Sequence, residues 1–116
     1  MDAIAPQADA LAMTNCISAR VRDSADGLMF EGQQRGIGGE AIREASIEQV
    51  EVFGKLVRER QLRTKIIGGG GISAAGHVKA YLDAGAEAVQ LATAIMIDPM
   101  VGCSILSEMS PGGHVR

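Results

Sequence analysis

Aromatic and basic side chains are scarce in this sequence. It has no tryptophan, one tyrosine and two phenylalanines in 116 residues, so it offers no stacking platform for nucleic-acid bases. Its 11 Lys and Arg are outnumbered by 14 Asp and Glu, which leaves a net charge of −3. Because nucleic-acid binding depends on a basic surface, we expect no nucleic-acid partner.

Long apolar runs and paired cysteines are also missing. No window approaches about 18 consecutive apolar residues, and no basic region precedes an apolar run at the N-terminus, so we expect neither a membrane span nor a secretory signal. Cys16 and Cys103 lie far apart in the sequence, and no CxxC pair occurs. This pattern favours two reduced thiols in a cytoplasmic protein over a disulfide or a metal site.

The length and the apolar content are those of one ordinary domain. Hydrophobic residues make up 47% of the chain, enough to bury a core, and 15 glycines indicate a loop-rich α/β protein. No domain boundary is visible, so residues 1–116 are treated as one domain. A complete (β/α)₈ barrel needs about twice this length.

The richest stretch is residues 65–93, KIIGGGGISAAGHVKAYLDAGAEAVQLAT. Residues 65–67 end in two isoleucines and are typical of a buried parallel strand. Glycines occupy positions 68–71. A helix is predicted from 74 to 84, with Ser73 as its N-cap.

The pattern of a strand followed by a loop of small residues repeats after this helix. Gly85 is predicted to end it, and residues 88–91 (AVQL) to form a second parallel strand that leads into a small-residue turn at 92–94. Adjacent loops without bulky side chains favour a phosphate site, because no Cβ keeps backbone N–H groups from the anion. A purely structural turn is the alternative.

Two other phosphate-binding motifs are excluded by the residues present. No Lys follows the glycines, so the loop is not a P-loop. The strand at 88–91 continues into Ala92 with no carboxylate for a ribose, which argues against a dinucleotide-binding fold. A mononucleotide phosphate fits better, because the last two βα loops of a (β/α)₈ barrel commonly bind one.

The N-terminal third predicts a strand followed by an excursion. Residues 10–14 (ALAMT) read as a buried strand that ends at Asn15 and Cys16. A buried polar side chain at this point either caps a turn or meets a ligand, and both alternatives stay open. Residues 17–34 show no helical period, and the Asp-Gly pair at 26–27 suggests a hairpin or a long ordered excursion.

A second glycine loop, residues 36–39 (GIGG), is predicted to open a helix over 40–61. An apolar stripe at helical spacing marks its buried face: Ile42, Ala45, Gln49, Val50, Phe53, Leu56 and Val57. The charged residues mark its solvent face: Arg43, Glu44, Glu48, Glu51, Lys55, Arg58 and Glu59. With one more helix expected over 100–109, the chain predicts three consecutive βα units, too few to close a barrel.

These motifs together resemble the C-terminal half of dihydroorotate dehydrogenases, with dihydropyrimidine dehydrogenases as the nearest rival. The resemblance spans residues 8–102 and is carried by a strand ending in TNC, the GIGG loop, IIGGGGI and AGAEAVQLATAI. It implies an incomplete (β/α)₈ TIM barrel that comprises the last three βα units. It also implies an FMN-dependent oxidoreductase of pyrimidine metabolism, which oxidises dihydroorotate to orotate.

The resemblance carries roles for particular residues. It implies that Asn15 hydrogen-bonds the pyrimidine substrate with Cys16 beside it, although Ser or Thr is usual in place of Cys16. It further implies that three loops surround the FMN phosphate through the following residues: Gly38, Gly39, Gly70, Gly71, Ala92 and Thr93. Gly38 replaces the usual Ser and Ala92 the usual Gly, and both are small enough for an anion to approach.

The resemblance also implies that this chain lacks the part of the family's barrel that carries the catalytic groups. In the family, five earlier βα units carry lysines near the flavin, most ring contacts and the base that takes a proton from the substrate. We therefore expect no catalytic residue and no metal ligand in this chain, and no activity from it alone. Self-association or a complementing N-terminal half is expected, and a non-catalytic phosphate-binding remnant is the alternative function.

Overall fold

The computed structural model describes residues 1–25 and 27–110, and its centre is a three-stranded parallel sheet. The strands stand in the order β1-β4-β5 and are β1 (Ala10–Met13), β4 (Lys65–Gly69) and β5 (Ala88–Gln90). All three lie where the sequence predicted strands. β4 differs in running two residues further than expected, into the glycine run.

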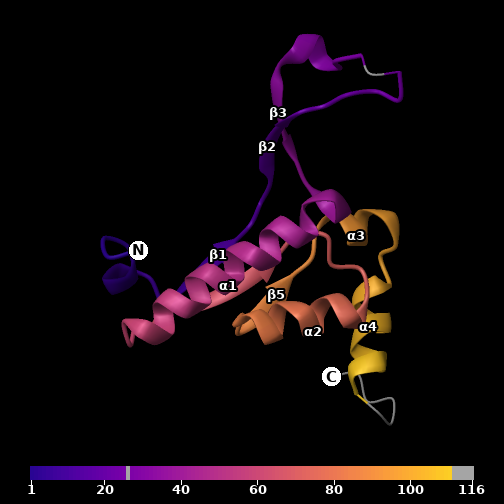
Figure 1. Ribbon diagram of the computed structural model, residues 1–116. Coiled ribbons are helices and arrows are strands. Elements are labelled where there is room, and N and C mark those ends of the chain that lie inside the picture. Colours follow the sequence, from indigo (N-terminus) through magenta and orange to yellow (C-terminus); the bar gives the residue numbers. More distant parts are fainter. Residues whose placement is uncertain (26, 111–116) are drawn as a thin grey trace.

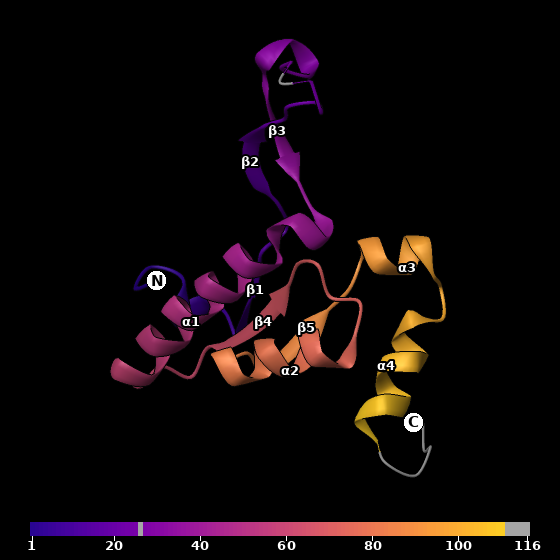
Figure 2. The same ribbon diagram turned by 45° about the vertical axis from the view of Figure 1, so that its right-hand side comes forward.

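Two helices cover one face of this sheet, as Figures 1 and 2 show. The α-helices of the described residues are α1 (Arg43–Glu59), α2 (Ala75–Ala84), α3 (Thr93–Ile97) and α4 (Val101–Met109). α1 and α2 pack against the sheet, and α4 packs against α2. Within the described part of the chain, no helix has the length and apolar character needed to cross a membrane.

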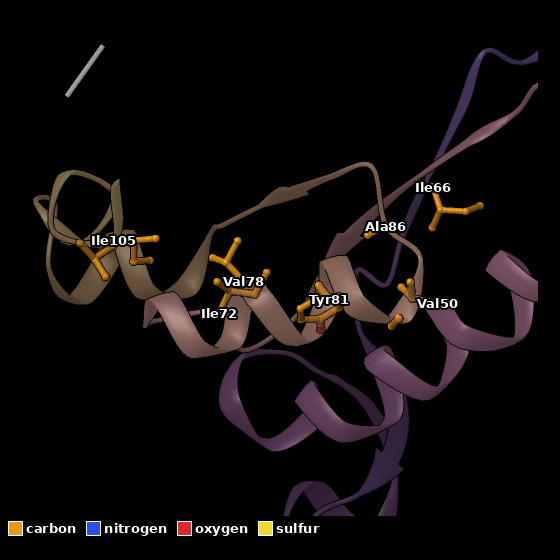
Figure 3. Packing of buried hydrophobic residues seen from close by; sticks show 9 residues of the cluster. Val50, Ile66, Ile72, Val78, Tyr81, Ala86 and Ile105 are labelled. Carbon is orange, nitrogen blue, oxygen red and sulfur yellow. The ribbon is translucent and has the colours of Figure 1, made fainter. Parts of the chain in front are cut away.

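The core lies between the sheet and its helices, and Figure 3 shows much of it. Its buried members are Val50, Ile66, Ile72, Val78, Tyr81, Ala84, Ala86, Val101 and Ile105. Successive strand residues point to opposite faces, so Ile66 points to the helices and Ile67 points away from them. Ile67 and its register partners Ala12 and Ala88 therefore form a small apolar face that neither helix covers.

An antiparallel hairpin projects from the sheet layer (Figure 1). Its strands are β2 (Ile17–Arg20) and β3 (Gln34–Ile37), with Ile17 opposite Ile37. This confirms an ordered excursion after β1. Asp26, half of the predicted Asp-Gly turn, lies outside the described residues. Short 3-10 helices also occur at Ala5–Gln7, Phe30–Gly32 and Gly39–Ile42.

The buried face of α1 differs from the predicted stripe. Ala45 and Gln49 are exposed, while Ser46 and Gly54 are buried. Gly54 is buried because the end of α2 passes directly over it: a Cβ there would lie 3.1 Å from the Ala84 carbonyl oxygen. The helix also starts later than expected, because residues 39–42 form a 3-10 helix instead of an α-helical turn.

The predicted ends of the later helices are partly right. Gly85 ends α2 with a left-handed φ of 115°, as expected. Ser73 as its N-cap was wrong, because Ala74 holds that position and no side chain caps the helix. The predicted turn at 92–94 is instead the start of α3. Nothing in the sequence indicates this helix, because its N-cap residue is Ala92, which has no side chain that can cap a helix. The last predicted helix is confirmed as α4.

Candidate functional site

A cavity of about 370 Å³ opens at the carboxyl end of the three parallel strands. The ends of parallel strands meet at one edge of a sheet, so loops distant in the sequence come together there. The lining residues come from four segments: Thr14 and Asn15, Gly39 and Glu40, residues 69–73, and residues 90–94 with Ile97.

The structure brings most of the predicted site residues to this cavity. Its lining includes the following: Asn15, Gly39, Gly70, Gly71, Ala92 and Thr93. Gly38 is outside the lining, one residue before Gly39. Cys16 is also outside it, because its Sγ lies at the base of the hairpin, 2.9 Å from where a Cβ on Gly36 would stand.

Two of the lining loops touch each other. Gly39 has a φ of 76°, and a Cβ on it would lie 3.4 Å from Cγ2 of Thr93. The loop before α1 and the loop after β5 therefore meet at the cavity edge, far apart as they are in the sequence. Glycine allows this approach with a left-handed backbone that other residues rarely adopt.

The carbonyl groups of the glycine loop after β4 are each held by another element. The Gly69 carbonyl accepts the Thr14 N–H at 3.0 Å. The Gly70 carbonyl accepts the Tyr81 hydroxyl at 2.7 Å, and the Gly71 carbonyl accepts Nη1 of Arg43 at 2.9 Å. The loop is thus fixed by β1, α2 and α1 together.

The reason for the glycines differs from the one predicted. A Cβ on Gly70 would lie 2.7 Å from Oγ of Ser46, and one on Gly71 would lie 2.9 Å from Cα of Glu40. Both directions lead into α1 and the turn before it. The glycines therefore admit close packing of the loop against α1, at φ values of 129° and 67°, and the prediction that a Cβ would intrude on the anion was wrong.

Sequence reasoning missed the side chains that hold this loop. Arg43 was assigned to the solvent face of α1, yet its side chain is only 22% exposed and it bonds the loop. His77 also contributes, since its Nδ1 accepts the Ser73 N–H at 3.1 Å. One signal was available for Tyr81: a tyrosine on the apolar face of a helix needs a partner for its hydroxyl.

The cavity itself carries little charge. Of the residues that the structure describes, no Lys or Arg lines it, and Glu40 brings the one carboxylate, on a side chain that is 83% exposed. Behind the loop, burial raises the pKa of Tyr81, while the Ser46 hydroxyl and the Arg43 charge oppose that rise. Among residues 1–25 and 27–110, no three His, Cys, Asp or Glu side chains gather as metal ligands would.

Comparison with known proteins gives the family. The model of the family described as dihydroorotate dehydrogenase matches residues 2–111, nearly the whole chain. The chain belongs to the dihydroorotate dehydrogenase family. The resemblance stated from the sequence motifs is thereby confirmed.

Two curated members of the dihydroorotate dehydrogenase family are similar to this chain. A dihydroorotate dehydrogenase of Dictyostelium discoideum is 30% identical over 95 residues, which cover 79% of this chain and 26% of that protein. The catalytic subunit of an NAD(+)-type dihydroorotate dehydrogenase B of Oceanobacillus iheyensis is 33% identical over 103 residues. That match covers 88% of this chain and 32% of the subunit, so the chain spans about a third of its relatives' length or less.

A solved structure agrees on the fold. The dihydroorotate dehydrogenase of Eimeria tenella, solved in complex with ferulenol, superposes with a TM-score of 0.68 at 24% identity. The match covers 87% of this chain and 26% of that one. The predicted fold class, an α/β chain that forms part of a TIM barrel, is confirmed, and with three parallel strands the barrel is incomplete.

Proposed function

We propose that residues 1–116 are a partial FMN-binding TIM-barrel domain that holds the cofactor's phosphate in a dihydroorotate dehydrogenase-type oxidoreductase. The observation that carries this proposal is the open cavity lined by loops at the carboxyl ends of β1, β4 and β5. This is the place where barrels of this class commonly bind phosphate. Family membership supports the cofactor class.

The residues present fit the phosphate end of FMN. In the described part of the chain, the N–H groups of Gly71 and Ile72 have no hydrogen-bond acceptor, and both residues line the cavity. The Thr93 hydroxyl belongs to the same lining. Since the lining has no Lys or Arg, neutral donors would carry most of the binding. Gly38, next to Gly39, and Ala92 complete the proposed phosphate surround.

The proposed substrate is dihydroorotate, and Asn15 is its proposed contact. Asn15 lines the cavity and presents both donor and acceptor groups, which suit a pyrimidine edge. Bound FMN supplies the acceptor for the hydride. An amide side chain orients a substrate but does not remove a carbon-bound proton, so we propose that the base comes from outside this chain. Cys16 does not reach the cavity and serves at most as a neighbour of Asn15.

Anaerobic bleaching of FMN by dihydroorotate tests the function. With this chain alone we expect no bleaching above background, because a positioned general base contributes on the order of 10²–10⁴ in rate and none is supplied. A complementing N-terminal half of a relative should restore it. In that assembly Asn15→Ala should weaken substrate use while FMN stays bound. The control Ser18→Ala, on the exposed hairpin, should leave both substrate use and FMN binding unchanged. Bleaching by the chain alone would overturn the proposal.

The partner proposed from the fold is a second β/α segment. Within the described residues, β1 and β5 are both edge strands, each with one edge that no other strand pairs, and the apolar face of Ala12, Ile67 and Ala88 lies beside them. We expect the isolated chain to self-associate or to be partly folded, and sedimentation velocity to show more than a monomer. A monodisperse monomer with cooperative unfolding would contradict this. The two free cysteines fit the proposed cytoplasmic location.

A further inference from the structure

The direction of two N–H groups follows from where their peptide carbonyls point. A trans peptide unit is planar, and its C=O and N–H bonds point in opposite directions. The Gly70 carbonyl points to Tyr81 and the Gly71 carbonyl to Arg43, both on the helix side of the loop. The next N–H groups along the chain, those of Gly71 and Ile72, therefore point away from the helices.

That opposite side is the cavity. Gly70, Gly71 and Ile72 line it, whereas Tyr81 and Arg43 do not. Neither N–H has an acceptor within the described residues, so both remain available to a ligand. Two adjacent outward N–H groups suit an oxyanion, which accepts several hydrogen bonds at once.

We propose that Tyr81 and Arg43 are positioning residues, which turn the N–H groups of Gly71 and Ile72 toward the oxyanion that the cavity binds. The proposal rests on the proposed phosphate-binding function and adds the groups that make the site. Neither side chain touches the anion. Each acts by holding the carbonyl on the far side of a peptide plane.

Tyr81 is well placed to hold its carbonyl. It is fully buried, and Figure 3 shows it among the core side chains. A Cβ on Gly68 would collide with the Tyr81 ring, so strand and ring fit closely. The buried Ser46 hydroxyl behind the loop has no hydrogen-bond partner within normal geometry among the described residues, so the Gly70 carbonyl is the partner of the phenol.

Arg43 adds charge to the same arrangement. Its guanidinium donates to the Gly71 carbonyl and lies 3.5 Å from the exposed Glu40 carboxylate, a separation too long for a strong pair. A charged donor makes a stronger hydrogen bond than a neutral one. It also polarises the peptide it binds, which strengthens the Ile72 N–H as a donor on the other side.

Hydrogen exchange with and without inorganic phosphate, at matched ionic strength, tests the proposal on the full chain. A peptide covering residues 69–76 should exchange quickly in chloride and become protected by phosphate. In Tyr81→Phe, which keeps the ring, half-protection should need several-fold more phosphate, on the order of tenfold at most. Arg43→Met should cost at least as much, and Arg43→Lys should recover part of the loss.

A matched control separates positioning from general weakening. Thr64 is buried at the other end of β4, and its hydroxyl also donates to a backbone carbonyl, that of Ala5, at 3.1 Å. Thr64→Val should leave the phosphate dependence unchanged. Equal losses in Tyr81→Phe and Thr64→Val would overturn the proposal, as would no loss in Tyr81→Phe.

The two proposals fail in different ways. If phosphate protects nothing in the wild-type chain, the phosphate-binding function fails. The positioning role is then judged without ligand, from exchange of the same peptide in chloride. Faster exchange in Tyr81→Phe than in Thr64→Val would still show that Tyr81 orders the loop, and equal exchange would overturn that role as well.

Discussion

The two glycine-rich loops beside the cavity differ in how tightly the rest of the chain holds them. In the glycine run that ends β4 and begins the loop after it, a Cβ on any of residues 68–71 would lie 3.1 Å or less from another group. Three of its carbonyls are also bonded by other elements. This loop is part of the packed layer between strands and helices.

The loop at 36–39 is looser. A Cβ on Gly38 would have the Asn15 carbonyl oxygen as its nearest neighbour, 3.8 Å away, which is ordinary contact. A Cβ on Gly36 would stand 2.9 Å from Sγ of Cys16, which is the end of an exposed side chain and not backbone. Gly39 is constrained by its left-handed φ and by Thr93. A high glycine content therefore does not mean that a loop is loosely held, because the more firmly held stretch, residues 68–71, consists of glycine alone.

The largest expected effect is at Gly71. In Gly71→Ala the new Cβ would stand 2.8–2.9 Å from Arg43, Glu40 and Gly39, and two of these contacts are backbone atoms. Backbone cannot swing aside as a side chain can, and φ of 67° adds strain. We expect a loss of about 3 kcal/mol in unfolding free energy, measured by urea denaturation followed by circular dichroism on the assembly with a complementing N-terminal half. A loss below about 1 kcal/mol would show that the loop can move off α1.

The position of the cavity could be predicted from the sequence, but the structural reason for its glycines could not. Asn15, the glycine runs and Thr93 follow apolar strand-like segments, and parallel strands bring their carboxyl ends together. Which way a Cβ would point depends on where α1 packs. That packing depends on Ser46 and Gly54, two small residues that share helical spacing with Ile42 and Val50 but are not apolar, so a stripe drawn from apolar side chains omits them.

The same limit applies to the helices. The strands and the long helices could be predicted from apolar runs and from the spacing of apolar residues, because both are features of the local sequence. Arg43 was assigned to solvent because it is charged, although its guanidinium reaches across to the Gly71 carbonyl, 28 positions along the chain. A long-range hydrogen bond of this kind leaves no local pattern, so Arg43 could not be assigned to the site. The bond that His77 accepts from Ser73 is local, four residues along the chain, and was missed for a different reason: a histidine in a helix has no fixed partner.

A smaller effect is expected from high pH at Tyr81. Burial raises the pKa of Tyr81 above its usual 10.0, so the folded chain keeps the phenol proton that the unfolded chain loses. Stability should therefore fall as pH rises above about 10, by at most about 1.4 kcal/mol per pH unit. Below that pH the group contributes no dependence.

The chain offers a clean reading of that titration. Tyr81 is its single tyrosine and it has no tryptophan, so absorbance at the tyrosinate band reports this residue alone. We expect the phenol to ionise at higher pH in the folded chain than in denaturant, and at higher pH still in Arg43→Gln, which removes a charge that lowers the pKa. In the stability measurement, Tyr81→Phe corrects for lysines that titrate in the same pH range. Identical folded and denatured titrations would contradict the firm packing of this loop.

The smallest effect is expected at Gly38, and it tests the loose side of the comparison. Its φ of −116° and ψ of −173° are extended backbone that any residue adopts, and a Cβ there meets nothing closer than 3.8 Å. Gly38→Ala should therefore change the unfolding free energy by no more than about 0.5 kcal/mol, with a slight gain expected because alanine restricts the unfolded chain. FMN or phosphate binding should also survive, since the substitution keeps the backbone N–H that the proposed site would use.

If Gly38→Ala costs as much stability as Gly71→Ala in the same urea titration, the loop at 36–39 is as tightly packed as the loop after β4. If it keeps its stability and loses only phosphate binding, then the Cβ of residue 38 points at the anion, which is the role first expected of Gly70 and Gly71.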